Sequence, residues 1–331
     1  MKLQRAIEKL RTKRVLVTGG AGFIGSNLSK RLLSEGVHVV VLDNLSTGKQ
    51  ENITPLMKYD NFTFIEGDIT DTNACYQAVK GVDAISHQAA LGSVPRSIEF
   101  PHNTHRVNAT GYLNMLHTAK ESSVKRFVYA SSSSVYGDSN ITPKKNGSEG
   151  KLLSPYAVTK QLNEMYANVY NTLHNVETIG LRYFNVFGPN QDPDGVYAAA
   201  IPKFLDKMIS GDIVTIHGDG EQTRDFTFVD NAVNANILAL ATENEEAFGK
   251  VYNVACGQFL SLNNVITSMQ TILEREGKLH TGTQVVNGPE RPGDIRDSLA
   301  DISDTTRDLG YEQPVLFGEG IEKYIASVLN V

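Results

Sequence analysis

A glycine-rich turn between a predicted strand and a predicted helix restricts the fold of this chain more than any other feature. Residues 14–18 (RVLVT) are mostly apolar and β-branched, as in a buried parallel strand. Gly19, Gly22 and Gly25 follow directly, and leucines then recur at helical spacing up to Gly36. A strand, a tight turn and a helix N-terminus in this order form a cradle for the pyrophosphate of a dinucleotide. The spacing is G-x-x-G-x-x-G rather than G-x-G-x-x-G, so the flanking strand and helix decide between this cradle and an ordinary glycine turn.

An aspartate at the end of the second predicted strand (VHVVVLDN) indicates which dinucleotide is bound. Asp43 lies eighteen residues after Gly25, where a carboxylate accepts hydrogen bonds from the adenine-ribose diol. The same charge repels a 2′-phosphate, so the sequence predicts NAD rather than NADP. The alternative is a loop aspartate that caps the next segment. Asp68, after the third strand, and residues 84–90 (AISHQAA) are predicted to line the adenine and nicotinamide pockets.

Strands and helices alternate from residue 14 to about residue 188, which predicts an α/β fold with a doubly wound parallel Rossmann sheet. The predicted strands cover residues 14–18, 37–42, 62–65, 83–87, 126–131 and 177–183, and the clearest helices cover 104–122 and 155–174. After residue 188 the chain becomes rich in Pro, Gly and Asp. We predict an NAD-binding Rossmann domain over 1–188, with a return segment at about 226–255. A smaller mixed substrate lobe is predicted over 189–225 and 256–331.

Composition excludes several classes of protein. The 331 residues are 40% hydrophobic, which suffices for more than one domain, and the net charge of −6 offers no basic surface to nucleic acid. No apolar run reaches the ~18 residues that a membrane span requires. The N-terminal MKLQRAIEKLRTK lacks the apolar core of a signal peptide. Two cysteines cannot form a disulfide framework, so we expect a reducing, cytoplasmic location, no nucleic-acid or membrane partner, and no metal site.

A second motif predicts the chemistry. Residues 126–137 (RFVYASSSSVYG) end a predicted strand in four serines, at the place where parallel sheets bind ligands. Tyr156 lies twenty-four residues after Ser132, and Lys160 lies one helical turn beyond Tyr156 on the same face. The lysine ammonium and the nicotinamide charge lower the tyrosine pKa from ~10 toward neutrality, so Tyr156 can act as a general base on a substrate hydroxyl. Many helices carry a tyrosine and a lysine at this spacing by chance, and it is the glycine turn and the serine-rich strand end that favour catalysis.

Taken together, these motifs resemble the nucleotide-sugar branch of the extended short-chain dehydrogenase/reductase family. The likeness runs from about residue 14 to the C-terminus through TGGAGFIG, LDNLSTG, GDITD, HQAALGSVPRS, SSSSVYGD, SPYAVTK, LRYFNVFGP and GDGEQTRDF, in the order of the family. Within this branch, QAALGSVPRS, RYFNVFGPNQDP and YAAAIPK are most similar to bacterial UDP-N-acetylglucosamine 4-epimerases of surface-polysaccharide pathways.

The resemblance implies roles for particular residues. Tyr156 would be the catalytic base, Lys160 its partner, Ser132 the catalytic hydroxyl and Ser133 the next residue to touch the sugar. NAD would be held by Gly19, Gly22, Phe23, Ile24, Asp43, Asn44, Ser46, Gly48, Asp68, Ile69, Gln88, Ala90, Tyr156, Lys160 and Tyr183. The UDP-sugar would be held by Asn185, Ala200, Lys203, Thr215, His217, Arg224, Arg291 and Asp294, with Gly92, Ser93, Ser132, Ser133 and Ser298 near the hexose. The two arginines suit a diphosphate because a guanidinium fork matches phosphate oxygens.

Three reactions of this branch diverge after oxidation at C4 of the sugar. The family's dehydratases carry Asp-Glu directly after the catalytic hydroxyl residue, and its decarboxylases carry Glu at the second position after it. Here these positions are Ser133 and Ser134. The resemblance therefore implies a 4-epimerase that oxidises C4, lets the keto sugar rotate and returns the hydride to the opposite face. UDP-GlcNAc and UDP-GalNAc are the expected substrates. The alternatives are a UDP-N-acetylhexosaminuronate 4-epimerase, a UDP-glucose 4-epimerase and a catalytically silent NAD-binding sensor or scaffold.

Two further expectations follow from the resemblance. In the family, the residue at the position of Ser298 (RDSLAD) faces the C2 substituent of the sugar, and a bulky tyrosine there is associated with the exclusion of N-acetyl groups. A serine leaves room for an acetamido group, although a serine in this sequence could equally be a helix N-cap or a turn residue. A homodimer is also expected, through a four-helix bundle of the helices near 104–122 and 155–174.

Overall fold

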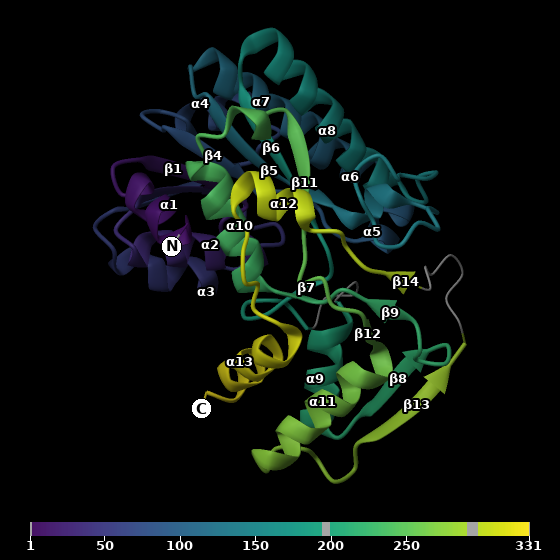
Figure 1. Ribbon diagram of the computed structural model, residues 1–331. Helices are drawn as coiled ribbons and strands as arrows, with labels where there is room; N and C mark the ends of the chain where they lie inside the picture. Colours follow the sequence, from purple (N-terminus) through teal and green to yellow (C-terminus); the bar gives the residue numbers. More distant parts are fainter. Residues whose placement is uncertain (1, 194–198, 290–296, 331) are drawn as a thin grey trace.

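A seven-stranded parallel sheet with helices on both faces forms the larger part of the molecule (Figure 1). The structure, a computed structural model, describes residues 2–193, 199–289 and 297–330. The strands lie in the order β11-β6-β5-β4-β1-β2-β3. Their bounds are β1 (Arg14–Thr18), β2 (His38–Asp43), β3 (Phe62–Glu66), β4 (Ala84–His87), β5 (Arg126–Ser132), β6 (Glu177–Tyr183) and β11 (Lys250–Val254). All neighbouring strands are parallel, which confirms the predicted doubly wound Rossmann sheet and, to within one residue at each end, its six predicted strands.

Helices cover both faces of this sheet, and this explains the continuous apolar runs of its strands. The lower face in Figure 1 carries α1 (Lys2–Leu10), α2 (Phe23–Ser34) and α10 (Val229–Ala241), and the upper face carries α4 (Thr72–Ala78), α7 (Tyr112–Glu121) and α8 (Pro155–His174). In β1, Val15 and Val17 belong to the core on the α2 side, whereas Leu16 belongs to the core under α4 and α7. Because successive side chains of a strand point to opposite faces, a strand buried on both faces needs apolar residues at consecutive positions.

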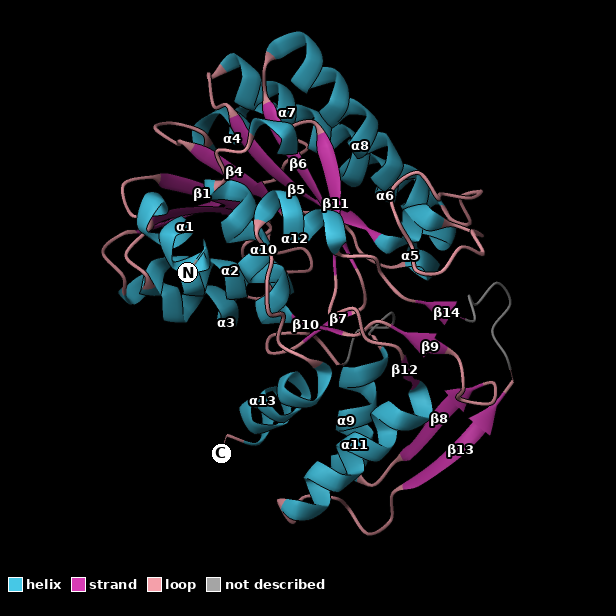
Figure 2. Cartoon of the chain, in the orientation of Figure 1, coloured by secondary structure: helices cyan, strands magenta, loops and turns pink. Residues whose placement is uncertain are grey.

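A smaller lobe lies below the sheet (Figure 2) and is built around two helices and two small sheets. It contains α9 (Ala200–Ser210), α11 (Leu262–Arg275), the parallel pair β8 (Ile213–His217) and β13 (Gln284–Gly288), and the three strands β12 (Leu260–Ser261), β9 (Thr223–Arg224) and β14 (Asp297–Ser298). The predicted helix at 201–211 (IPKFLDKMISG) corresponds to α9. The chain returns to the main sheet through α10 and β11, which pairs with β6. The division into two domains stays a prediction.

The other elements are short, apart from one C-terminal helix. They are α3 (Gln50–Ile53), η1 (Thr54–Lys58), α5 (Val94–Glu99), α6 (Pro101–His105), η2 (Arg106–Gly111), η3 (Ser133–Tyr136), β7 (Val186–Phe187), β10 (Thr227–Phe228), η4 (Glu245–Ala247), α12 (Ser303–Leu309) and α13 (Phe317–Leu329). No helix within the described ranges is both long and apolar enough to cross a lipid bilayer.

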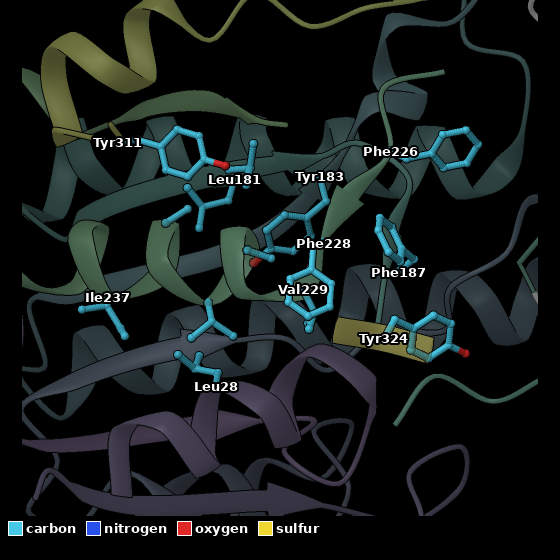
Figure 3. Packing of buried hydrophobic residues seen from close by; sticks show 14 of the residues in the cluster. Leu28, Leu181, Tyr183, Phe187, Phe226, Phe228, Val229, Ile237, Tyr311 and Tyr324 are labelled. Carbon is cyan, nitrogen blue, oxygen red and sulfur yellow. The ribbon is translucent and has the colours of Figure 1, made fainter. Parts of the chain in front are cut away.

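Aromatic side chains join the C-terminal helix to the rest of the molecule (Figure 3). The ring of Phe187 packs against that of Phe228, with centroids 5.7 Å apart, and against that of Tyr324 on α13, with centroids 6.2 Å apart. Phe187, Phe228 and Tyr324 are all buried. Large aromatic rings contribute much of the apolar area in such contacts, so this cluster anchors α13 against the short strands β7 and β10.

The helix predicted over 104–122 is continuous but not uniformly α-helical. Its middle, η2, is a π-helical turn between α6 and α7. Within this turn the side chain of Asn108 is buried and bonded to another segment: its Oδ1 accepts from the Leu91 backbone N–H at 2.7 Å, and its Nδ2 donates to the Leu91 carbonyl at 3.1 Å. Gly111 lies against Ile69, where an added Cβ would stand 2.7 Å from the isoleucine Cδ1. These long-range contacts accompany the π-turn, and periodicity alone cannot predict them.

Candidate functional site

A cavity of about 560 Å³ opens where the strands of the main sheet end. Most residues that the sequence predicted to hold NAD line this cavity: Gly19, Gly22, Phe23, Ile24, Asp43, Asn44, Ser46, Asp68, Ile69, Gln88, Ala90, Tyr156, Lys160 and Tyr183. Gly92 and Ser93, predicted to lie near the hexose, also line it. Residues from the six strands β1 to β6 and the loops after them thus meet at one place, as ligand sites of doubly wound sheets do.

The glycine turn leaves room that any side chain would fill. Gly19 has a φ of +68°, and a Cβ there would stand 2.7 Å from Cα of Ala89. A Cβ on Gly25 would stand 2.2 Å from the Gly19 carbonyl oxygen, so only glycine lets α2 begin this close to β1. Gly22 is the N-cap of α2, and no side chain caps this helix. The first N–H groups of α2 therefore remain available to a phosphate, and the cradle fits the pyrophosphate of a dinucleotide.

Asp43 lies at the end of β2, and its carboxylate shapes the next part of the cavity. Its Oδ2 accepts from the Ala21 backbone N–H at 2.9 Å, and its Oδ1 accepts from the Leu45 N–H at 2.8 Å. Burial raises the pKa of Asp43, and these two bonds oppose the shift. A carboxylate has about four acceptor positions, so capacity remains for a ribose diol. Gly48 does not line the cavity but lies against this carboxylate, since a Cβ there would stand 3.0 Å from Oδ1.

Two residues of the cavity wall, Gln88 and Tyr183, belong to a hydrogen-bonded cluster. The hydroxyl of Tyr183 donates to Oε1 of Gln88 at 3.0 Å and accepts from Nδ2 of Asn236 at 2.8 Å. Nε2 of Gln88 donates to Oδ1 of Asn236 at 3.0 Å and to Oγ of Ser86 at 2.9 Å. The sequence predicted Gln88 and Tyr183 and included Ser86 in the segment 84–90, but it did not indicate Asn236. Asn236 comes from α10, far along the chain, so no local pattern could have indicated it.

Tyr156 and Lys160 lie in the first turns of α8, beside the carboxyl end of β5. The hydroxyl of Ser154 caps the helix by accepting from the Ala157 N–H at 3.2 Å, which fixes where α8 begins. Nζ of Lys160 donates to the carbonyl of Ala130 at 2.8 Å and lies 5.8 Å from the centroid of the Tyr156 ring. The strand and the helix are therefore joined by the lysine itself.

Burial perturbs both ionisable groups of this pair. It lowers the pKa of Lys160 to about 8, which the negative charge of Glu164 opposes. It raises the pKa of the half-buried Tyr156 phenol, which hydrogen bonding with Ser132 opposes. A desolvated ammonium beside a phenol is the arrangement in which a nearby positive charge favours the phenolate. Perturbed groups of this kind gather at functional sites.

Ser132 and Ser133 lie at the point where β5 passes into η3. Oγ of Ser132 accepts from the Ser134 backbone N–H at 3.1 Å, which leaves its own hydroxyl hydrogen free to be donated toward Tyr156 or a substrate oxygen. Neither serine is among the residues of the cavity wall, whereas the preceding Ser131 is. The predicted serine-rich strand end thus reaches Tyr156, and Ser131 faces the cavity whereas Ser132 and Ser133 do not line it.

The other residues predicted to hold the UDP-sugar lie outside the wall of this cavity. In the described part of the chain they are Asn185, Ala200, Lys203, Thr215, His217, Arg224 and Ser298. Two of them meet, because β14 pairs in parallel with β9 and places Ser298 opposite Arg224. His217 contacts the Pro289 carbonyl through Nδ1 at 3.1 Å. The predicted Arg291 and Asp294 lie outside the described residues.

Asp225, which sequence reasoning did not single out, connects three segments around this pair of strands. Its carboxylate is fully buried and accepts backbone N–H groups from Cys256 and Gly257, each at 3.0 Å, and from Ala300 at 3.3 Å. Burial raises the pKa of Asp225 to about 6, and the backbone bonds oppose this. The segment that carries Ser298 is thereby held beside Arg224.

Gln191 is a second cavity residue that the sequence pattern missed. It lines the cavity, and its Nε2 donates to the Val186 carbonyl at 3.1 Å. Its Oε1 is buried and has no hydrogen-bond partner within the described structure. A buried acceptor without a partner carries a free-energy cost that a donor on a ligand would relieve.

The parallel sheet, the glycine cradle and the tyrosine–lysine pair define a dinucleotide-dependent enzyme that acts on an alcohol or carbonyl carbon. The NAD dependent epimerase/dehydratase family matches residues 15–255, and the chain belongs to this family. NAD is accordingly its cofactor, as the carboxylate at the end of β2 predicted.

Relatives with known names share nearly the whole chain. The UDP-glucose 4-epimerase of Mycolicibacterium smegmatis is 35% identical over 96% of this chain and 99% of its own. The UDP-N-acetylglucosamine 4-epimerase of Methanobrevibacter ruminantium, in complex with UDP-N-acetylmuramic acid, is 35% identical, with a TM-score of 0.88 over 96% of this chain and 98% of that one. The UDP-glucuronic acid 4-epimerase of Bacillus cereus, in complex with UDP-glucuronic acid and NAD, is 31% identical, with a TM-score of 0.86 over 96% and 99%.

Proposed function

We propose that this protein is an NAD-dependent UDP-sugar 4-epimerase whose substrates are UDP-GlcNAc and UDP-GalNAc. The observation that carries the proposal is the convergence of Tyr156, Lys160 and Ser132 beside the cofactor cavity. Elimination or decarboxylation at the same site would require acidic residues after Ser132, and Ser133 and Ser134 stand there instead. The named relatives support a UDP-sugar 4-epimerase and differ in the sugar that they act on.

In this proposal Tyr156 takes the proton of the C4 hydroxyl and later returns it. NAD, when bound, would accept a hydride from C4, and its positive charge would favour the phenolate. Lys160 holds its ammonium next to Tyr156, which favours the phenolate over the phenol. Ser132 shares the hydrogen bond of the substrate oxygen and orients it. The Ala130 carbonyl accepts a hydrogen bond from Lys160, so the lysine ammonium is already positioned beside Tyr156 before the substrate binds.

The smaller lobe is proposed to hold the UDP moiety. Arg224 on β9 would contact the diphosphate, since a guanidinium forms paired charge-assisted bonds to phosphate oxygens. Thr215 and His217 on β8 would contact the nucleoside. A diphosphate held firmly outside the cavity and a hexose held loosely inside it would allow the sugar to turn while the nucleotide stays bound.

The small side chain of Ser298 is the reason to prefer N-acetylated substrates. Ser298 pairs with Arg224, and the nearby Ala300 backbone N–H donates to the Asp225 carboxylate, which holds this segment in place. A serine at the C2 position of the sugar leaves space for an acetamido group, whereas a larger side chain would fill this space.

The substrate assignment is tested by direct turnover. The purified protein is incubated separately with UDP-GlcNAc, UDP-N-acetylglucosaminuronic acid, UDP-glucuronic acid and UDP-glucose, and the C4 epimers are resolved by NMR. We expect UDP-GalNAc from the first substrate at the highest kcat/KM. Faster turnover of a uronate or of UDP-glucose would contradict the proposed substrate and leave the 4-epimerase reaction standing. Absence of turnover with every UDP-sugar would favour the NAD-binding sensor or scaffold.

Replacing Ser298 by tyrosine should reverse the preference at C2. Ser298→Tyr is expected to lower kcat/KM for UDP-GlcNAc by at least ~10-fold, because the ring overfills the space of the acetamido group. Turnover of UDP-glucose should be unchanged or improved, since its C2 hydroxyl is smaller. The measurement is the ratio of kcat/KM for the two substrates, with Ser298→Ala as the control that keeps the space open. A ratio that does not move in Ser298→Tyr would show that this residue does not contact C2.

A homodimer is part of the proposal. The exposed face of α8 carries a row of apolar side chains at helical spacing, formed by Val158, Met165, Val169 and Leu173, which are 46–68% exposed. Ile98 of α5 and Phe100, which follows it, are also exposed, and α5 packs beside α8. Contiguous apolar area of this kind on a surface marks an interaction site. A second copy of the same helix would cover it with a two-fold, self-complementary contact.

A further inference from the structure

A buried ionic cluster lies behind the tyrosine–lysine pair, and the mechanism proposed above does not use it. Arg182 of β6 is only 4% exposed and forms a two-pronged contact with Glu164 of α8: Nε donates to Oε1 at 2.8 Å and Nη2 donates to Oε2 at 2.7 Å. Nη1 of the same arginine donates to Glu149 at 2.5 Å. Its guanidinium lies 4.8 Å from the ring centroid of Tyr136.

Glu164 reaches from this cluster to the serine-rich end of β5. Oγ of Ser131 donates to Oε1 of Glu164 at 2.5 Å. Ser131 is buried, lines the cofactor cavity and directly precedes Ser132. The Glu164 carboxylate therefore holds the β5 residue that directly precedes the proposed catalytic Ser132.

Glu164 also lies on the catalytic face of α8. It follows Lys160 by four residues and Tyr156 by eight, so all three share one side of the helix. The charge of Glu164 opposes the effect of burial on Lys160, whose pKa is lowered to about 8. The neighbouring Glu149 contacts the same arginine from the loop before α8 but neither touches Ser131 nor shares this helix face.

The other groups that face Glu164 do not change charge near neutral pH. Tyr129 of β5 and Tyr112 of α7 are buried, and burial raises the pKa of each phenol well above its ordinary value. Burial alone would lower the pKa of Arg182, but its hydrogen bonds with Glu164 outweigh burial and raise that pKa, so the guanidinium stays charged. Among the described groups around Glu164, Lys160 is therefore the one whose titration near neutral pH its charge moves, in opposition to burial, and Tyr156 shares the same helix face.

We propose that Glu164 is a positioning residue for proton transfer: it fixes Ser131, and through it the Ser132 end of β5, and keeps a negative charge beside Lys160. A purely stabilising role is a weaker explanation, because a buried ion pair contributes little net stability once its desolvation cost is included. The inference rests on the proposed roles of Tyr156 and Lys160.

The sign of the electrostatic effect follows from the two charges. A carboxylate near the pair favours the ammonium and disfavours the phenolate, so its removal lowers the pKa of Lys160 and of Tyr156 together. Removal of the hydrogen bond from Ser131 alone should misplace Ser132 without changing the charge. The two contributions can thus be separated by different substitutions.

The test compares Glu164→Gln with Glu149→Gln in the NAD-loaded protein. Both variants remove one carboxylate from Arg182, but only the first removes charge from the catalytic face. In Glu164→Gln, the acidic and alkaline limbs of the kcat/KM pH profile should both move to lower pH, by ~1 unit. Glu149→Gln should leave both limbs in place. The phenolate band of Tyr156, followed by ultraviolet difference titration against Tyr156→Phe, should move with the acidic limb.

A fall in kcat for Glu164→Gln with both limbs unmoved would overturn the electrostatic role, and equal shifts in the two variants would assign the effect to Arg182 instead. Ser131→Ala tests the positioning role separately. It also keeps the proposal testable if Glu164→Gln does not fold. It should lower kcat by ~10-fold or more with the limbs in their wild-type place, because a small displacement of a catalytic group is costly. Wild-type kcat in Ser131→Ala would contradict the proposal. If Tyr156→Phe itself stays active, the proposed base is wrong, and that failure is separate from this one.

Discussion

At the scale of single residues, the site depends on what surrounds each side chain more than on its identity. Tyr156 and Lys160 at a spacing of four occur in many helices, but here the lysine is buried and bonded to the Ala130 carbonyl at the end of β5. The phenol stands against the cofactor cavity, where desolvation raises its pKa. It therefore needs the nearby positive charges to ionise, and without them it would remain a neutral phenol at working pH.

Replacement of Tyr156 by phenylalanine tests this dependence directly. Tyr156→Phe keeps the ring and its packing but removes the hydroxyl that carries the proton, so kcat should fall by at least ~100-fold. NAD should stay bound, because the cradle around Gly19 and Asp43 is untouched. Turnover is measured by NMR, and the bound cofactor is released with acid and quantified. Activity near that of the wild type would show that another group is the base.

The same scale shows what the sequence could and could not predict. Gln88, Asp43 and Tyr183 were predicted because each lies in a short motif beside a strand end, and all three line the cavity. Asn236 and Glu164 were missed because their importance comes from partners that are distant in sequence, Tyr183 and Arg182 respectively. Hydrogen bonds between distant segments leave no periodic signal in either segment. Sequence patterns therefore indicate the residues that line a site more readily than the residues that hold them in place.

At the scale of elements, the strands were predictable and part of the helical structure was not. Runs such as RVLVT have one explanation, a strand buried on both faces, so their bounds agree with the structure. The π-turn of η2 is instead accompanied by the bond between Asn108 and Leu91, a contact with the segment after β4 that no local pattern reveals. The short strand β9 likewise forms by pairing with β12 on one side and β14 on the other, and these two-residue sequences carry no strand signal.

The junction of β1 and α2 is the element-level feature most sensitive to a single methyl group. In Gly25→Ala the new Cβ would stand 2.2 Å from the Gly19 carbonyl, so α2 must move away from the strand. Overpacking of this kind costs ~1–3 kcal/mol, and the displaced helix N-terminus should also bind NAD more weakly. Thermal unfolding and titration of the cofactor-free protein with NAD measure both effects. Gly318→Ala in α13 is the matched control, because its Cβ would meet nothing within 4 Å and alanine favours a helix. Equal NAD affinity in Gly25→Ala and wild type would mean that the helix N-terminus does not hold the phosphates.

At the scale of the whole molecule, the helices on the two faces of the main sheet differ in how much apolar surface they expose. The side covered by α1, α2 and α10 is closed by further contacts, including the packing of α1 against α10. On the other side, α8 buries Ala157, Asn163 and Ala167 toward the sheet and turns Met165, Val169 and Leu173 outward. An apolar row on the outer face of a helix marks a surface that a partner would cover. This is the face that the proposed homodimer would cover.

The homodimer is the last prediction, and it belongs to this scale. In the double variant Met165→Glu and Val169→Glu, each helix of the pair would place two carboxylates in an apolar contact opposite their own symmetry copies. Desolvation and like-charge repulsion should then separate the subunits, because neither charge would find a partner at the interface. Sedimentation velocity at micromolar concentration should show a dimer for the wild type and a monomer for the variant. Val328→Glu on α13, where the native side chain is 43% exposed and thus comparable with Val169 at 46%, is the control and should remain dimeric. A monomeric wild-type protein would refute the dimer, and a double variant that stays dimeric would place the interface away from α8. Dissociation of the control as well would show that the loss of the dimer is not specific to α8.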